Sequence, residues 1–148
     1  QQGVYRLTPF PRVPHEDLFI AWLAAGPEAV ISHDSALAIY ELSDALPAHI
    51  HLTVPRTASH RRSGYRLHTS RTTPAEITRY GGLQVTTVAR TIADIACDGL
   101  ADDLMIQAVQ EAVARGPAPP EQLWAAAAQR GPAVTRLIQR ALEGVREP

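Results

Sequence analysis

Two histidines in the middle of the chain have a spacing that could serve a metal ion. His49 and His51 are two residues apart in an alternating polar and apolar stretch, so on a β-strand their side chains share one face. No third ligand with a recognisable spacing accompanies them, and the zinc-protease pattern His-Glu-x-x-His is absent. We therefore expect both histidines to face solvent on a strand surface, and we expect no metal site.

The residues that could act as nucleophiles or as acid–base groups do not form a familiar catalytic pattern. Cys97 lies near the apolar end of a helical stretch with no histidine beside it, which favours a buried structural thiol. The pair His33-Asp34 stands at a helix start, where Asp34 is explained by its favourable interaction with the helix dipole. Neither a Gly-x-Ser-x-Gly elbow nor a glycine-rich phosphate loop occurs. We expect no catalytic centre and no cofactor.

Positive charge is concentrated in one part of a slightly acidic chain. The net charge is −1 and all 14 basic residues are arginine, yet residues 45–79 contain six arginines and a single acid, giving this segment a net charge of +5. Such a segment could bind nucleic-acid phosphates or an acidic protein surface, or it could be a solvated face whose arginines pair with acids elsewhere. The candidate nucleic-acid or partner-binding residues are Arg56, Arg61, Arg62, Arg66 and Arg71.

Length and composition indicate one globular domain. A chain of 148 residues with 45% hydrophobic and 20% charged residues can bury a core. No apolar stretch approaches the ~20 residues that a membrane span needs. The single cysteine excludes an intrachain disulfide. We expect a cytoplasmic protein without membrane contacts.

The elements that must position these side chains are predicted to form an α+β fold. Helices are expected at 14–25 and 33–42, the second capped by Ser32. A small, mostly antiparallel sheet follows, in which residues 49–54 and 65–68 form a β-hairpin with a basic tip. A turn at Gly81-Gly82 leads into a further strand at 83–85.

The last third of the chain is predicted to be a bundle of about four helices. They are expected at 86–97, 101–115, 119–131 and 132–145. Arg90 and Asp94 are one helical turn apart in the first of them and can form an ion pair. Thr73 and Glu76 have the spacing of a capping box that starts a short helical turn before the bundle.

Four segments, in this order and spacing, resemble the C-terminal domain of AbiEi-type antitoxins, a bacterial family of toxin–antitoxin and phage-defence regulators. They are Ala29–Leu42, His51–Arg56, Gly82–Thr87 and Ala89–Ala96. The resemblance implies an antitoxin that neutralises a nucleotidyltransferase-type toxin. It also implies that the full-length protein represses its own operon through an N-terminal winged helix.

The resemblance also suggests domain boundaries. Gly3-Val4-Tyr5 is similar to the end of the family's wing, so residues 1–7 are expected to be a remnant of a missing winged helix and 8–148 a single antitoxin domain. DNA binding would then use the basic hairpin together with that winged helix. The acidic residues Asp102, Asp103 and Glu111 offer a competing surface for the toxin.

A second interpretation remains open. Proteins resembling very-short-patch-repair nucleases have a similar middle region. The alternative is therefore an accessory nucleic-acid-binding domain of a transcriptional regulator, or of a repair-type endonuclease that has lost its catalytic domain.

Overall fold

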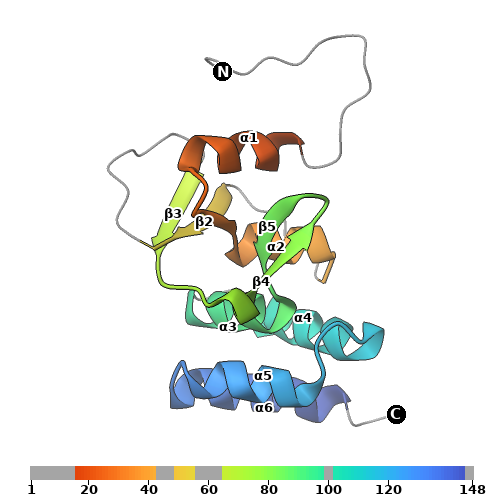
Figure 1. Ribbon diagram of the computed structural model, residues 1–148. Helices are drawn as coiled ribbons and strands as arrows, with labels where there is room; N and C mark the ends of the chain where they lie inside the picture. Colours follow the sequence, from red (N-terminus) through yellow and green to blue (C-terminus); the bar gives the residue numbers. More distant parts are fainter. Residues whose placement is uncertain (1–15, 43–48, 56–64, 99–101, 146–148) are drawn as a thin grey trace.

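The computed structural model describes residues 16–42, 49–55, 65–98 and 102–145, which contain six α-helices and one five-stranded sheet (Figure 1). In chain order the elements are α1 (Glu16–Ala25), β1 (Val30–Ile31), α2 (His33–Tyr40), β2 (Ile50–Val54), β3 (Tyr65–Thr69), the 3₁₀ turn η1 (Pro74–Glu76), β4 (Ile77–Tyr80), β5 (Leu83–Thr86), α3 (Val88–Asp98), α4 (Asp102–Arg115), α5 (Pro120–Ala128) and α6 (Pro132–Val145). The expected mixture of helices with one small sheet is confirmed. None of these helices is long and apolar enough to cross a bilayer.

The sheet is mixed, with strand order β3-β2-β1-β5-β4. β1 pairs with β2 and β4 with β5 in antiparallel fashion, whereas β1–β5 and β2–β3 are parallel. The predicted hairpin of β2 and β3, and with it the mostly antiparallel sheet, is therefore wrong. Alternation of polar and apolar residues identifies a strand but not its direction. The polar stretch between the two strands, roughly ten residues, is close to the length that a parallel crossover needs.

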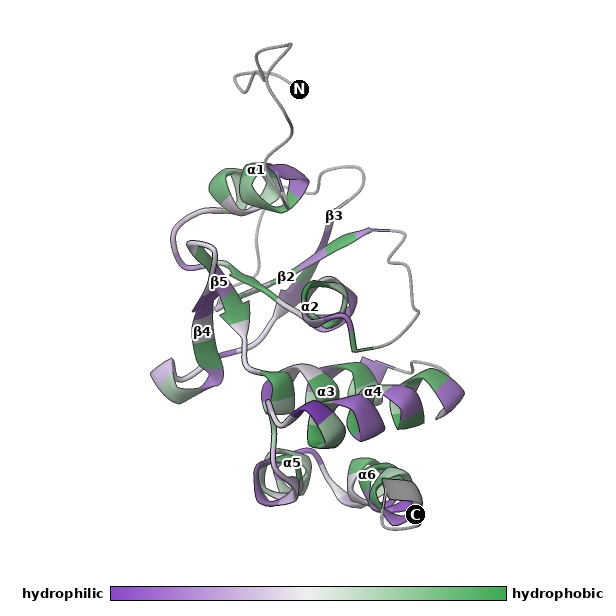
Figure 2. Ribbon diagram, turned by 90° about the vertical axis from the view of Figure 1, so that its right-hand side faces the viewer, coloured by the Kyte–Doolittle hydropathy of each residue, from purple (hydrophilic) through white to green (hydrophobic). Residues whose placement is uncertain are grey.

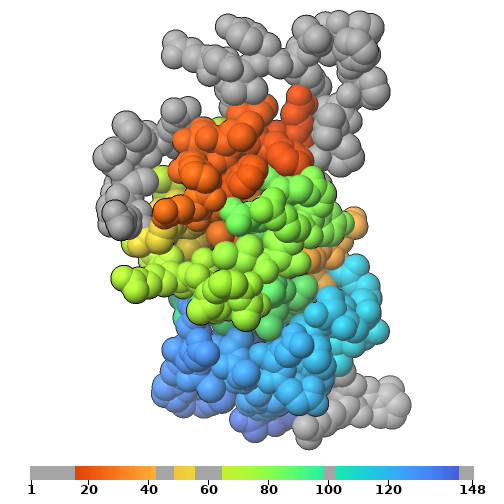
Figure 3. All heavy atoms as spheres, viewed as in Figure 1, coloured from red at the N-terminus to blue at the C-terminus, as the bar shows by residue number. Residues whose placement is uncertain are grey.

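The hairpin of this sheet lies further along the chain, in β4 and β5. Gly81 and Gly82 have φ angles of +58° and +93°, a backbone conformation that tight hairpin turns require and glycine adopts without strain. The sequence predicted this turn and β5, but it gave no signal for β4, because Thr78 to Tyr80 are exposed at the sheet edge. In Figure 3 the hairpin lies at the surface, between α1 and the C-terminal helices.

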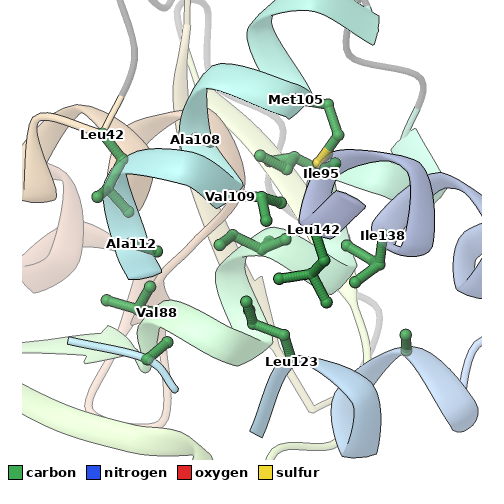
Figure 4. Close-up of a cluster of buried hydrophobic side chains, with 14 of the residues drawn as sticks. Leu42, Val88, Ile95, Met105, Ala108, Val109, Ala112, Leu123, Ile138 and Leu142 are labelled. Atoms are coloured by element: carbon green, nitrogen blue, oxygen red, sulfur yellow. The ribbon is translucent and has the colours of Figure 1, made fainter. Parts of the chain in front are cut away.

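Two hydrophobic clusters hold the layers together. In the first, α1 packs on the sheet through Leu18, against Ile31 and Leu52. In the second, α3 to α6 surround a core that includes Met105 and Ile138 (Figure 4). Figures 1 and 2 show the corresponding arrangement, with α1 on one side of the sheet and the pairs α3–α4 and α5–α6 stacked beyond its other side.

Helix α2 belongs to both clusters, since Ile39 lies in the first and Leu37 in the second. It contacts both β2 and α3, and Ser35 near its start accepts the His51 backbone N–H. The region where α2, β2, β3 and the end of α3 meet is therefore a junction between the two halves of the fold.

Candidate functional site

Three histidines from three separate elements stack at this junction. The rings of His33 and His68 lie nearly parallel, at an angle of 10° with their centroids 3.6 Å apart. The His51 ring lies 5.1 Å from that of His68 and 6.0 Å from that of His33. His51 Nδ1 and His68 Nε2 are 2.9 Å apart, which is hydrogen-bond distance. We call His33, His51 and His68 the histidine cluster.

The parallel register of β2 and β3 brings two of these rings together. His51 lies opposite Arg66, and His68 lies opposite Thr53. His51 and His68 are therefore diagonal neighbours on one face of the sheet, close enough for long side chains to touch. The expected solvent-facing position is wrong for His51, which is 6% exposed, because both faces of β2 are covered. His49 lies just before the strand and is exposed, as expected.

His33 is held in an uncommon backbone conformation. Its φ is +53°, a region that residues other than glycine seldom adopt. Its Nδ1 lies 2.8 Å from Ser32 Oγ, and the Thr53 hydroxyl donates to the same oxygen at 2.7 Å. Ser32 does occupy the N-cap position of α2, but its side chain does not cap the helix. The hydroxyl instead ties the helix start to β2, and the surrounding contacts offset the backbone strain.

Burial keeps the histidine cluster neutral. Burial lowers the pKa of His33 to about 3, and the His68 and His51 rings and the Arg130 and Arg90 guanidinium groups act in the same direction.

Burial also lowers the pKa of His51 and of His68. Asp34 opposes this shift at His51 and Asp98 opposes it at His68, but neither reverses it. At pH 7 the three rings are consequently uncharged, and their unprotonated ring nitrogens can accept a hydrogen bond or bind a metal ion.

The last turn of α3 borders the histidine cluster. One ligand atom from each of His51, His68 and Asp98 lies within 4.8 Å of the other two, the spacing of a candidate metal site. Cys97, the neighbour of Asp98, is exposed. The predicted buried thiol is therefore wrong, because the final residues of α3 extend beyond the cores that bury its earlier turns.

A second polar cluster lies on the same helix, around Arg90. The predicted pair with Asp94 is confirmed, and Arg90 Nε donates to both carboxylate oxygens at 2.9 and 3.1 Å. Arg90 Nη1 donates to the carbonyl oxygen of Arg71 and to Glu76, and Nη2 donates to Ser70. The two side chains of the Arg90–Asp94 pair are only 7% and 2% exposed. Arg90 thus connects α3 to the segment between β3 and β4.

Arg130 extends this cluster from the C-terminal helices. Its Nη2 contacts Asp94 Oδ1, and its Nη1 lies 3.7 Å from Cys97 Sγ. Burial alone lowers the pKa of Arg130, but the adjacent Asp94 carboxylate more than offsets this effect and raises it. We call Arg90, Asp94, Glu76 and Arg130 the ionic network.

Glu76 also completes the predicted capping box, which is confirmed. Its Oε1 accepts the Thr73 backbone N–H at 2.9 Å. Partial burial acts to raise the pKa of Glu76, but the hydrogen bonds from Thr73 and Arg90 outweigh it and lower the pKa. The same side chain therefore caps η1 and binds Arg90.

Two of the five predicted binding arginines fall within the part of the chain that the structure describes. Arg66 on β3 and Arg71 just after it are exposed. Arg56, Arg61 and Arg62 lie outside the described residues, as does the predicted basic tip.

On the competing acidic surface, Asp103 and Glu111 are exposed on α4, and Glu111 pairs with Arg115 at 3.5 Å. The side chain of Asp102 is outside the described set.

Comparison with known proteins gives no further guide to this site. No protein-family model matches the chain, and no curated protein matches it.

The histidine cluster was the main feature that sequence reasoning missed. The sequence spacing singled out His49 and His51 as possible ligands. The structure instead brings together His51 and His68, which are 17 residues apart. A usable signal was present, because His51 and His68 each occur in a predicted strand. Pairing the two strands in either direction makes them candidates for contact.

Proposed function

We propose that this domain is an antitoxin-type regulatory domain that binds and neutralises a nucleotidyltransferase-type toxin in the bacterial cytoplasm. In the full-length protein a winged helix would add repression of the operon. One observation carries this proposal: the described residues of the four segments that resemble AbiEi-type antitoxins form a single packed unit. β1 pairs with both β2 and β5, and α2 packs on β2 and α3.

Hydrogen bonds between these segments support the proposal. Thr53 donates to Ser32 at 2.7 Å, and the His51 backbone N–H donates to Ser35 Oγ at 2.8 Å. Tyr40 donates its hydroxyl proton to the carbonyl oxygen of Thr86 at 2.8 Å. The residues behind the resemblance thus depend on one another structurally, as the members of a shared fold do.

The surface around β3 is the proposed toxin-binding face. β3 is an edge strand of the sheet, and it carries the exposed Arg66, with Arg71 next to it. An edge strand offers free backbone groups to a partner, and arginines suit carboxylates on an acidic protein surface. The acidic residues of α4 are the competing face.

The test is co-expression with the nucleotidyltransferase-like product of the neighbouring gene, followed by size-exclusion chromatography. Co-elution is expected for the wild-type chain. We expect the double variant Arg66→Gln and Arg71→Gln to reduce both co-elution and neutralisation of the toxin.

The matched control, Asp103→Asn with Glu111→Gln, also removes two exposed charges and should bind like wild type. If only the control variant lost toxin binding, the interface would lie on α4. Separate elution of two folded proteins would refute stable binding by this domain.

The exposure of Arg66 and Arg71 also favours nucleic-acid binding as a second candidate function. In that case affinity for DNA should fall steeply with salt, and removing two phosphate contacts should lower the slope of log K against log salt by about 2. An unchanged slope in the double arginine variant would exclude these two side chains as phosphate contacts.

A further inference from the structure

We propose that His51, His68 and Asp98 form a binding site for a divalent transition-metal ion of the zinc class. The site would join β2, β3 and the C-terminal end of α3. It shares β3 with the proposed toxin-binding face, but the inference does not depend on the antitoxin proposal.

The distances between the ligand atoms carry this inference. Zinc binds imidazole nitrogen at about 2.0–2.1 Å, so two nitrogens on one ion lie roughly 2.9–3.4 Å apart for angles between square and tetrahedral. His51 Nδ1 and His68 Nε2 are 2.9 Å apart, at the lower end of this range. The separation of these two nitrogens therefore matches that of two ligands on one ion, and both rings must turn so that their lone pairs point at it.

Asp98 supplies the third ligand. Its carboxylate has an oxygen within 4.8 Å of both nitrogens, and its side chain is exposed. A shift of about 1–2 Å brings that oxygen to ligand spacing, and an exposed side chain makes such a shift by changing its rotamer. Two imidazoles and one carboxylate are a donor set that zinc uses where a fourth position stays open to water.

The surroundings favour a cation at this position. Asp98 is the last residue of α3, where the helix dipole presents its negative end. Asp34 adds a negative charge close enough to influence His51. Arg66 is an opposing charge that acts on both ligand histidines. Arg90 and Arg130 lie nearby, but both are neutralised by the carboxylates of the ionic network.

His33 and Ser35 hold the ligands in place. The His33 ring stacks on His68 at 3.6 Å and so fixes the plane of that ligand. The His51 backbone N–H is bound by Ser35 at the start of α2. Ligands oriented before the ion arrives lose less conformational entropy when they bind it, which raises affinity.

Binding also requires a rearrangement of protons between the two rings. In the metal-free pair one ring N–H donates to the other ring nitrogen. Both nitrogens must be unprotonated to bind the ion, so the donor ring moves its proton to its other nitrogen. The two neutral rings release no net proton in this step.

The first experiment titrates Zn²⁺ into the full chain, purified without a histidine tag, by isothermal calorimetry. Co²⁺ serves as a spectroscopic probe of the same site. We expect one equivalent of each metal to bind, with a visible absorption band for Co²⁺. At a free zinc concentration near 100 times Kd, the melting temperature should rise by about 5–10 °C.

Two variants and their matched controls identify the ligands. His68→Gln and Asp98→Asn should each weaken zinc binding by at least about tenfold, and the histidine variant by more. His49→Gln changes an exposed histidine next to the same strand, and Asp103→Asn changes an exposed carboxylate on α4; both should bind like wild type. Because Asp98 is exposed, we expect Asp98→Asn to fold, so the test remains valid even if His68→Gln fails to fold.

Two results would overturn the proposal. The first is the absence of saturable zinc binding to the wild-type chain below about 1 mM, since that affinity is the weak end of protein–ligand binding. The second is zinc binding that His68→Gln and Asp98→Asn leave unchanged, which would place the ion elsewhere.

Discussion

The ionic network and the histidine cluster lie close enough to influence one another electrostatically, and they satisfy their polar atoms in opposite ways. Arg90 donates through Nε, Nη1 and Nη2 to four different residues. The histidine cluster relies on ring stacking, on one contact between ring nitrogens and on the contact of His33 Nδ1 with the Ser32 hydroxyl. In the ionic network, buried charges are neutralised by opposite charges. In the histidine cluster, the lowered pKa of each ring keeps the ring uncharged.

This difference separates a structural role from a binding role. Arg90 directs Nε and both Nη atoms at protein acceptors, so the ionic network fixes how α3 sits against the segment before β4. Neutral imidazoles keep lone pairs that a metal ion can use. We therefore assign fold definition to the ionic network and ligand binding to the histidine cluster.

The largest effect is expected from Arg90→Met, which breaks the ionic network at its centre. The substitution leaves Asp94 buried without its main partner, and breaking a buried ion pair from one side costs about 3–5 kcal/mol. Urea unfolding at pH 7 measures the loss. Glu111→Gln is the control, because it removes an exposed ion pair worth at most about 0.5 kcal/mol. A loss below 1 kcal/mol for Arg90→Met would contradict the structural role.

The ionic network was also the region that the sequence predicted better, and the reason is the distance along the chain between partners. Arg90 and Asp94 are four residues apart and Thr73 and Glu76 three, so helical spacing alone identifies both pairs. The contacts of Arg90 with Ser70 and Glu76 join residues that are far apart in the sequence, so local spacing could not predict them.

The histidine cluster escaped prediction because it depends on which elements lie side by side. Its members come from α2, β2 and β3, and the pairing of β2 with β3 places His68 beside His51. Hydrophobic periodicity identified the helices and two of these strands, since it reflects local burial. It could not tell which strand lies beside which, nor that both faces of β2 would be covered.

A second, smaller effect should appear when the pH is lowered. His33 has a folded-state pKa of about 3 and an ordinary pKa of 6.5, so below pH 6.5 protons bind preferentially to the unfolded chain. Stability is therefore fully present above pH 6.5 and falls as the pH falls toward 3. Between pH 7 and pH 5 the contribution of His33 is a loss of about 2 kcal/mol. The lowered pKa values of His51 and His68 act in the same direction.

The variant His33→Asn tests the source of this acid sensitivity. Asparagine tolerates the positive φ of this position better than other non-glycine residues, so the backbone can be kept. Urea unfolding at pH 7 and pH 5, in the presence of a chelator, should show a smaller loss for the variant than for the wild type. Arg136→Gln, a substitution at an exposed position on α6, should keep the full pH-dependent loss. Equal losses for the wild type and His33→Asn would show that the acid sensitivity arises elsewhere.

The smallest expected effect concerns the outer member of the ionic network. Arg130→Gln removes a partner of Asp94 whose side chain is 23% exposed, and Arg90 continues to neutralise the same carboxylate. We expect a loss of about 1 kcal/mol, since the partly exposed pair is screened by solvent. Arg136→Gln, an exposed position on α6, is the matched control and should change stability by less than about 0.5 kcal/mol.

The combination of Arg130→Gln with Arg90→Met decides whether the network acts as one unit. With both arginines gone, Asp94 has lost its guanidinium partners and can take up a proton, so the second substitution has a different cost from the first. The two losses should then fail to add by at least 0.5 kcal/mol, the range found for residues in one network. Additive losses would mean that Arg130 contributes only its own packing, and that Arg90 alone maintains the link between α3 and the segment before β4.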